Sequence, residues 1–464
     1  MVSKINGILF FLLLSAGLCS FFFLKPEVVS MDEKRTLAAM PGFNWESYAS
    51  GQWADSIGRY INDHFPARSN LVNMAGILRH SRGIHFENEE KVVVLEGTGN
   101  LQSDPDTEAE LTDTAAIFED FGDGASIDSI PLVEIDFNEH MWRSLLILNG
   151  RVYPLMGGSP KMGAAFGRML NEYATRFNGG VRVFSAVPPL SCSFIPSEKY
   201  RKYNQQNHST VEGIRNSLGP GAYYCDVFSA LNSHTNEKLF YGTDHHWTAN
   251  GAYHGYTAFC RAAGFEPVSR DRMEYRVKYN FLGSFYTLIR DKSIAEHPDT
   301  FEYYIPPVKS TAVEFGPNDY RPKKSNTFCH GSSGGNCYST FICGDHPLMK
   351  ITTGNKNGKK AMVIKNSMGN AFSVYLISHY EEVWVMDFRY SKHNLSDIIK
   401  RNKINDLIFA VGMHAAMSSG TIRMMRNLAV QKGAALPPLP ATPSVSLDSV
   451  SHTKPVSASP DSAK

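Results

Sequence analysis

The fold class of this chain is decided by residues 361–411, which read AMVIKNSMGNAFSVYLISHYEEVWVMDFRYSKHNLSDIIKRNKINDLIFAV. Short apolar runs alternate there with segments of helical spacing, so the stretch predicts a strand, a helix, a strand, a helix and a strand. We expect these elements at residues 361–364, 371–378, 383–386, 395–400 and 407–411. This alternation is typical of parallel βαβ units. The sequence therefore predicts an α/β fold.

Polar residues follow each of these strands. Ser367 lies in a turn of small residues after the first strand, residues 387–390 follow the second, and residues 412–414 follow the third. Ligands bind parallel sheets outside the carboxyl ends of the strands, so we expect a site at this edge. A serine after a strand is also a common helix N-cap, and that alternative stays open for Ser367.

A second motif, Asp244-His245-His246-Trp247, lies far from the serine in the sequence. An acid, a base and a nucleophile on separate loops are the components of Ser-His-Asp chemistry. The leading interpretation is thus a serine-dependent site for acyl transfer or ester cleavage. The alternative is a buried polar cluster packed around the indole. His254, His379 and His393 are expected to be surface or core histidines.

Further elements are predicted outside this region. Residues 45–82 have helical spacing that is interrupted at Asp63-His64-Phe65-Pro66. Strand-like runs are expected at residues 91–95, 145–148, 181–187 and 223–228.

Composition excludes one class of partner. The chain has 464 residues, 42% hydrophobic and 20% charged, with a net charge of +1. Nucleic-acid-binding proteins concentrate Lys and Arg to neutralise phosphates, so no nucleic-acid partner is expected. No cofactor is predicted either.

Both ends of the chain are predicted to lie outside the fold. Residues 7–24 are apolar or small, which favours an uncleaved single-span membrane anchor over a removed signal peptide. The bulk of the chain is then expected outside the cytoplasm. From residue 436 onward the chain is rich in Pro and Ser without aromatics, which predicts a disordered tail.

Six cysteines follow the predicted anchor, an even number that permits disulfides in an exported chain. A cluster of Cys329, Cys337 and Cys343 with His330 and His346 invites a zinc interpretation. Its spacing fits no compact zinc motif, so we expect a disulfide or free thiols and no metal.

The motifs together resemble the bacterial DHHW family. Asp244-His245-His246-Trp247 with residues 248–253 is similar to its hallmark, and residues 32–41 and 60–68 are similar to its opening segment. The serine turn and residues 386–390 complete a resemblance over residues 30–430.

That family in turn resembles the SGNH-hydrolase-like domains of alginate O-acetyltransferases. The resemblance implies an SGNH-hydrolase-like three-layer α/β sandwich with a mostly parallel sheet. With the anchor and tail predicted above, the expected domains are an anchor or signal segment at 1–25, a helical segment at 30–85, the SGNH-like domain at 86–430 and the tail at 431–464.

The resemblance also implies a triad, with Ser367 as nucleophile, His246 as general base and Asp244 as the orienting carboxylate. Candidates for oxyanion or substrate binding are Met368, Gly369, Asn370, Arg389 and Tyr390. Supporting roles are implied for His245, Trp247, Asn366 and Asp387.

This chain departs from the relatives' pattern in two places. Asn366 stands where related serine turns carry an aspartate. Residues 388–390 and 413–414 offer no evident asparagine as an oxyanion donor.

Two functions follow from these expectations. The first is an O-acetyltransferase or esterase acting on a cell-surface or secreted polysaccharide, with a membrane-bound O-acyltransferase as a possible partner. The second is a non-catalytic carbohydrate-binding or scaffold protein on a degenerate SGNH fold. In either case we expect a bacterial, single-pass membrane protein with its main domain in the periplasm or at the cell surface.

Overall fold

The computed structural model describes residues 29–30, 35–36, 38–65, 91–94 and 144–434. The predicted anchor at 1–25 and residues 435–464 of the predicted tail lie outside the described residues. Within the described ranges, no helix is long and apolar enough to cross a membrane. The domain boundaries stay predictions.

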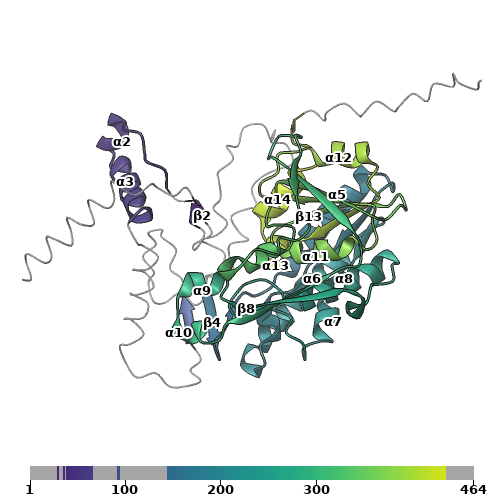
Figure 1. The fold of residues 1–464 in the computed structure, drawn as a ribbon, viewed down its shortest axis with the longest axis horizontal. Coiled ribbons are helices and arrows are strands. Elements are labelled where there is room, and N and C mark those ends of the chain that lie inside the picture. Colours follow the sequence, from purple (N-terminus) through teal and green to yellow (C-terminus); the bar gives the residue numbers. More distant parts are fainter. Residues whose placement is uncertain (1–28, 31–34, 37, 66–90, 95–143, 435–464) are drawn as a thin grey trace, which may run out of the picture.

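A mixed sheet organises the chain between residues 144 and 434 (Figure 1). Its strands are β6 (Arg182–Ser185), β7 (Ala222–Tyr224), β10 (Ser310–Phe315), β11 (Lys323–Ser325), β12 (Leu348–Thr353), β13 (Lys360–Lys365), β14 (Glu382–Asp387) and β15 (Asp406–Ala410). They are arranged in the order β11-β10-β12-β14-β13-β15-β6-β7. The five strands from β14 to β7 run parallel, whereas β12, β10 and β11 extend the sheet antiparallel. The predicted α/β class is confirmed, and the antiparallel extension was not predicted.

Helices cover both faces of this sheet (Figure 1). The elements of one face are α5 (Pro160–Arg176), α6 (Arg201–Ser217), α12 (Leu395–Asn402) and α14 (Ser419–Asn427); those of the other are α7 (Val227–Asn232), α8 (Ala249–Ala263) and α11 (Met368–Leu376). Successive residues of β13 alternate between the two cores: Met362 and Ile364 pack with the first group, Ala361 and Val363 with the second. A strand with helices on both sides is apolar on both sides. This explains the unbroken apolar run in the sequence.

The strand–helix order expected for residues 361–411 is confirmed by β13, α11, β14, α12 and β15. One other prediction is wrong in part. Residues 223–228 form a strand only to Tyr224, because the Asp226 carboxylate accepts a hydrogen bond from the Ser229 amide and caps α7.

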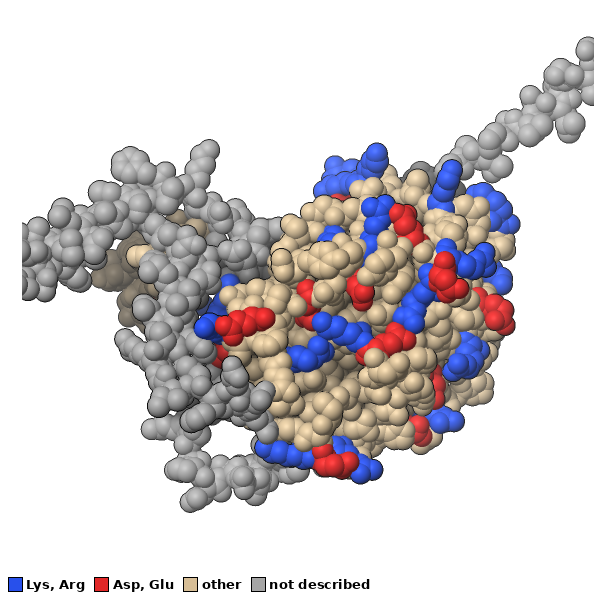
Figure 2. Space-filling model, turned by 60° about the horizontal axis from the view of Figure 1, so that its bottom comes forward, with Lys and Arg blue, Asp and Glu red and all other residues tan. Residues whose placement is uncertain are grey.

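The other strands and α-helices of the described chain are smaller. They are the antiparallel pair β1 (Val29–Ser30) and β2 (Arg35–Thr36), the antiparallel set β3 (Lys91–Val94), β4 (Ser144–Leu148) and β5 (Arg151–Pro154), the pair β8 (Glu274–Phe281) and β9 (Asp299–Ile305), and the helices α2 (Trp45–Ala49), α3 (Gln52–Asp63), α9 (Ser284–Ile289), α10 (Lys292–Ala295) and α13 (Met413–Ala416). The α3 helix ends at Asp63, as predicted, and the rest of the predicted helical segment up to residue 82 lies outside the described residues. Basic and acidic side chains are interspersed on the face drawn in Figure 2, in keeping with the net charge of +1.

Candidate active site

Ser367 lies between β13 and α11, at the carboxyl edge of the parallel strands. It occupies the N-cap position of α11, but with helical angles (φ −53°, ψ −27°), and within the described chain its side chain makes no capping hydrogen bond. A Cβ atom on Gly369 would lie 2.5 Å from the Lys365 Cβ and 2.6 Å from the Ala410 carbonyl oxygen. Glycine is therefore needed at 369 for α11 to begin this close to the sheet. The N-cap alternative does not explain the hydroxyl.

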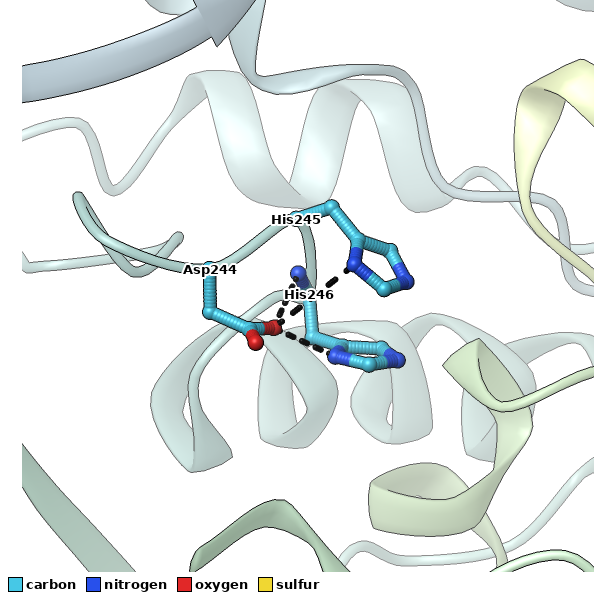
Figure 3. Close-up of side chains that lie close together, drawn as sticks. All are labelled: Asp244, His245 and His246. Atoms are coloured by element: carbon cyan, nitrogen blue, oxygen red, sulfur yellow. Dashed lines mark hydrogen bonds and ion pairs between the residues drawn. The ribbon is translucent and has the colours of Figure 1, made fainter. Parts of the chain in front are cut away.

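The Asp244 carboxylate orients the imidazole of His246. Its Oδ1 accepts hydrogen bonds from the His246 amide at 3.0 Å and from His246 Nδ1 at 2.5 Å (Figure 3). Its Oδ2 accepts from the Ser284 amide at 2.7 Å. A Cβ on Gly283 would lie 2.2 Å from the Asp244 Cβ, so a glycine there permits this close approach.

The other ring nitrogen of His246 is the chemically important one. Because a carboxylate accepts the Nδ1–H hydrogen bond, the neutral imidazole carries its lone pair on Nε2. Nε2 is buried and makes no hydrogen bond within the described part of the chain, and the residue as a whole is only 5% exposed. Among the described residues the Ser367 hydroxyl therefore makes no hydrogen bond to Nε2, and the lone pair of this nitrogen is available to accept a proton.

Two contacts join the Asp244–Trp247 motif to the serine turn. The Trp247 indole donates to the Met368 carbonyl at 2.8 Å, and the Tyr338 hydroxyl donates to the same oxygen at 3.4 Å. The ring of Tyr338 lies on the ring of His246, with centroids 3.7 Å apart. The motif and the residue after Ser367 thus share one buried cluster.

Asn366 links the serine turn to the end of β15. The Asn366 Oδ1 accepts a hydrogen bond from the backbone amide of Gly412 at 3.2 Å. This contact fixes the orientation of the Asn366 side chain, so that its Nδ2 faces His414 Nε2 at 3.1 Å. Since Nδ2 is a donor, His414 Nε2 must accept and the ring is neutral. Burial, with Arg389 and His246 nearby, lowers the pKa of His414 to about 4, which agrees with this assignment.

A charge cluster lies beside the turn, with Lys365 and Asp387 fully buried, Arg389 partly buried and Asp345 at the surface. Lys365 and Asp387 are register partners at the ends of β13 and β14, and the Lys365 ammonium binds Asp387 at 2.9 Å and Asp345 at 2.6 Å. Arg389 contacts both carboxylates at 2.7 Å. Although burial opposes it, Asp387 and Asp345 raise the pKa of Arg389 well above its usual value. The cluster holds two positive and two negative charges and is locally neutral.

A pocket opens next to this site, with an empty space of about 280 Å³ that includes the part open to solvent. Prolines and other apolar side chains form most of its wall. The residues that connect it to the site are His245, Met368, Gly412 and His414.

Asp244, His245 and His246 each bring one possible ligand atom within 4.8 Å of the others, the only such metal-capable group in the described ranges (Figure 3). A metal ion there would have to replace the Asp244–His246 hydrogen bond. His245 Nδ1 lies 2.7 Å from the Ser284 hydroxyl. The donors present are therefore better explained as a hydrogen-bonded set than as a metal site.

The structure gives several sequence-predicted residues other partners. The Gly369 amide donates to the Asn366 carbonyl at 2.9 Å, Asn370 Nδ2 donates to Asp345 at 2.9 Å, and Arg389 is held by its two carboxylates. Tyr390 is 46% exposed beneath the Arg389 guanidinium. The roles predicted for the site residues remain predictions.

The three histidines expected to be surface or core residues contact groups outside the Asp244–Trp247 motif and the serine turn. His254 is 3.2 Å from Glu237, His379 bonds the Tyr256 hydroxyl at 2.6 Å, and His393 bonds the Gly316 carbonyl at 2.7 Å.

Sequence reasoning missed Tyr338, Asp345 and Lys365. Tyr338 and Asp345 come from the Gly/Ser-rich cysteine cluster, where Cys329 and Cys343 form a disulfide. Lys365 directly follows the apolar run of β13 and has no exposed surface. Its burial marks it as unusual, but burial could not be seen in the sequence.

A family model and one solved structure point to the same family. A family model described as DHHW protein matches residues 144–386, more than half of the chain. A DHHW family protein from Eubacterium siraeum is 31% identical, with a TM-score of 0.55, over 61% of this chain and 94% of that one. Bacillus cereus PatB1, solved with a sulfonyl adduct, is 16% identical with a TM-score of 0.50 over 60% of this chain and 97% of that one.

A more distant match is the O-acetyltransferase domain of Pseudomonas putida AlgJ, 12% identical with a TM-score of 0.32 over 60% of this chain and 96% of that one. No curated protein matches the sequence.

Proposed function

The chain belongs to the DHHW family, and from this premise we propose that it is a serine-dependent O-acyltransferase or esterase. Its substrate is a cell-surface or secreted polysaccharide, and its intermediate is an ester of Ser367. The observation that carries the proposal is the His246 imidazole, which is fixed by Asp244 through Nδ1 while Nε2 is buried and makes no hydrogen bond within the described chain. A buried polar atom without a partner costs free energy, and in this proposal the use of Nε2 as the base offsets that cost.

The proposed chemistry follows from these groups. The Ser367 hydroxyl attacks the carbonyl carbon of an acyl ester while His246 Nε2 takes its proton. The Asp244 carboxylate stabilises the imidazolium that forms. When the tetrahedral intermediate collapses, the leaving alkoxide takes the proton from His246 and leaves as the alcohol. A sugar hydroxyl, or water in an esterase, then releases the acyl group by the reverse proton path.

The negative charge that develops on the carbonyl oxygen must be stabilised by hydrogen-bond donors. In this proposal the amides of Ser367 and Met368 supply them at the N-terminus of α11, where the helix dipole favours an anion. Met368 also lines the neighbouring pocket, whose wall is mostly apolar.

The setting of the reaction is also proposed. The apolar residues 7–24 anchor the chain, and the main domain is extracytoplasmic, in the periplasm or at the cell surface. The Cys329–Cys343 disulfide supports an oxidising compartment. A membrane-bound O-acyltransferase would supply the acyl group as a partner.

One observation favours a second candidate, a non-catalytic carbohydrate-binding protein. The Gly369 amide, the Asn370 amide nitrogen and the Arg389 guanidinium are all engaged in hydrogen bonds, so three expected oxyanion donors are occupied.

The two candidates are separated by hydrolysis of a chromogenic acetyl ester by the purified full-length chain. Ser367→Ala and His246→Ala should each abolish turnover, whereas Ser373→Ala should retain it. Ser373 is a matched control because it lies on the same helix, fully buried, with its hydroxyl bonded to the Gly369 carbonyl. A sulfonyl fluoride should add to Ser367 in the wild type, as read by peptide mass. Absence of both turnover and labelling, with glycan binding retained, would favour the scaffold.

A further inference from the structure

The disulfide-closed segment 329–343 lies directly against the candidate base. It contains the 3₁₀ helix Gly334–Thr340, and Cys329 and Cys343 join its ends. Tyr338 from this segment is 4% exposed, and its ring is nearly parallel to that of His246, at an interplanar angle of 8°. The two rings therefore form a face-to-face contact in the core of the site.

This contact restrains the imidazole in a direction that Asp244 does not. The Asp244 hydrogen bond fixes Nδ1 but leaves the ring free to pivot about that bond. Tyr338 covers one face, and the His245 ring lies 3.8 Å away between centroids. Pivoting would then require the tyrosine to move, and its hydroxyl is tied to the Met368 carbonyl beside Ser367. Burial and then the Asp244 charge raise the pKa of Tyr338 well above its usual value, so the hydroxyl stays a neutral donor.

The segment that carries Tyr338 is held in a costly conformation. Ile342 and Cys343 both have positive φ, 48° and 59°, and a β-branched residue rarely adopts this region. Such strain persists only where surrounding contacts determine the backbone. Here the disulfide joins both ends of the segment. In addition, the Cys329 amide donates a hydrogen bond to the Thr340 carbonyl, and the Lys278 ammonium donates one to the Thr340 hydroxyl.

We propose that Tyr338 is a positioning residue for His246, and that the Cys329–Cys343 disulfide keeps it in place against the imidazole. The effect of Tyr338 on turnover rests on the proposed function, whereas its effect on the position of the His246 ring does not. Tyr338 exchanges no proton in this scheme and acts only through the position of the His246 ring.

The first test compares Tyr338→Leu with Tyr338→Phe. Phenylalanine keeps the stack and loses only a long hydrogen bond, so kcat for the acetyl ester should fall by about threefold or less. Leucine removes the aromatic face, and kcat should fall by about 10- to 100-fold, because a small misplacement of a catalytic group costs this much. The bell-shaped pH profile should shift with it, since the environment of the base has changed.

The matched control is Tyr173→Leu. Tyr173 is equally buried, at 2% exposed, and its hydroxyl also donates to a backbone carbonyl, that of Met425, but it lies in the core on the opposite face of the sheet. It should lose stability without shifting the pH profile. An equal loss of kcat in both leucine variants would overturn the proposal and leave Tyr338 a core residue.

The role of the disulfide is tested by Cys329→Ser with Cys343→Ser, made in the wild type and in Tyr338→Leu. Serine substitution avoids exchange with the buried thiol of Cys337. If the disulfide acts through Tyr338, its removal should lower kcat about 5- to 50-fold in the wild type and less than about twofold in Tyr338→Leu. If removal of the disulfide lowers kcat by the same factor in the wild type and in Tyr338→Leu, the disulfide does not act through Tyr338.

A readout without turnover keeps the test separate from the proposed function. The His246 ring protons are followed by NMR through a pH titration in the wild type, Tyr338→Phe and Tyr338→Leu. A change of His246 pKa or tautomer population in the leucine variant alone supports positioning even if the wild type proves inactive. An unchanged titration in Tyr338→Leu would overturn it even if the wild type is an active enzyme.

Discussion

Two polar regions lie side by side at the carboxyl edge of the sheet, and they differ in how completely they are paired. In the charge cluster of Lys365, Asp345, Asp387 and Arg389, each charged group contacts two or more partners. In the Asp244–His246 pair, the carboxylate is saturated by backbone and ring donors, but His246 Nε2 makes no hydrogen bond within the described chain.

The difference indicates different tasks. A buried network in which each charge is paired fixes a conformation and leaves no group to react. A fixed imidazole with an unused nitrogen has a cost in stability, and in the proposed function it is the base. Substitutions in the first region should therefore affect stability, and substitutions in the second should affect turnover.

Apart from the substitutions of Ser367 and His246, the largest effect is expected from Asp244→Asn. An amide can donate to Nδ1, which would move the imidazole proton to Nε2 and remove the base. We expect ester turnover to fall about 10³- to 10⁴-fold, with the chain still folded. Steady-state kinetics beside circular dichroism measure this; a loss below tenfold would show that Asp244 does not set the tautomer.

Lys365→Met should have the next largest effect, on stability. It leaves two carboxylates with only Arg389 between them, and removing one partner of a buried ion pair costs about 3–5 kcal/mol. The free energy of unfolding from urea titration measures it.

Lys350→Met is the control for that substitution. Lys350 pairs with Glu382 at 2.9 Å but is 27% exposed, so the cost should stay below about 1 kcal/mol. Equal costs for the two lysines would mean that burial does not distinguish the cluster.

Acid should weaken the fold through two histidines whose pKa is low. Burial lowers the pKa of both His414 and His379 to about 4 from an ordinary value of 6.5. Between pH 6.5 and 4 the unfolded chain binds protons that the folded chain does not. Stability should therefore fall as pH drops through this window, by on the order of 1 kcal/mol per pH unit for His414 and by less for the half-buried His379, which solvent screens.

His414→Gln and His379→Gln should each flatten that dependence when unfolding free energies are compared at pH 7 and pH 4.5. His414 is the informative case because it bonds Asn366 beside the serine turn. An unchanged slope in both variants would contradict the neutral assignment.

The smallest effect is expected from His245→Gln. His245 lines the pocket and contacts Ser284, but its Nδ1 is 3.9 Å from Asp244 Oδ1, against 2.5 Å for His246. Turnover should change by less than about threefold, as for a residue outside proton transfer. A loss as large as that of His246→Ala would reverse the assignment of the base.

Local sequence was sufficient to predict much of this edge. The alternation of strands and helices in residues 361–411 follows from apolar spacing, and the carboxyl ends of parallel strands meet at one edge whatever the details. The Asp244–His246 contact is also local, because an aspartate side chain readily accepts from the amide two residues ahead. The spacing of two residues was thus informative by itself.

What only the tertiary structure decided are the contacts across long stretches of chain. Trp247 and Met368 are 121 residues apart, and no periodicity indicates that an indole donates to that carbonyl. No pattern in the sequence indicates that the Tyr338 ring stacks on His246 or that Asp345 pairs with Lys365. Nor does any pattern select Cys329 and Cys343, among six cysteines, as the disulfide partners. These contacts depend on how the loop 326–346 packs over the sheet, and packing is set by the whole core. Sequence pattern determines which elements form and which face they bury, whereas the final partners of buried polar groups are fixed only when those faces meet.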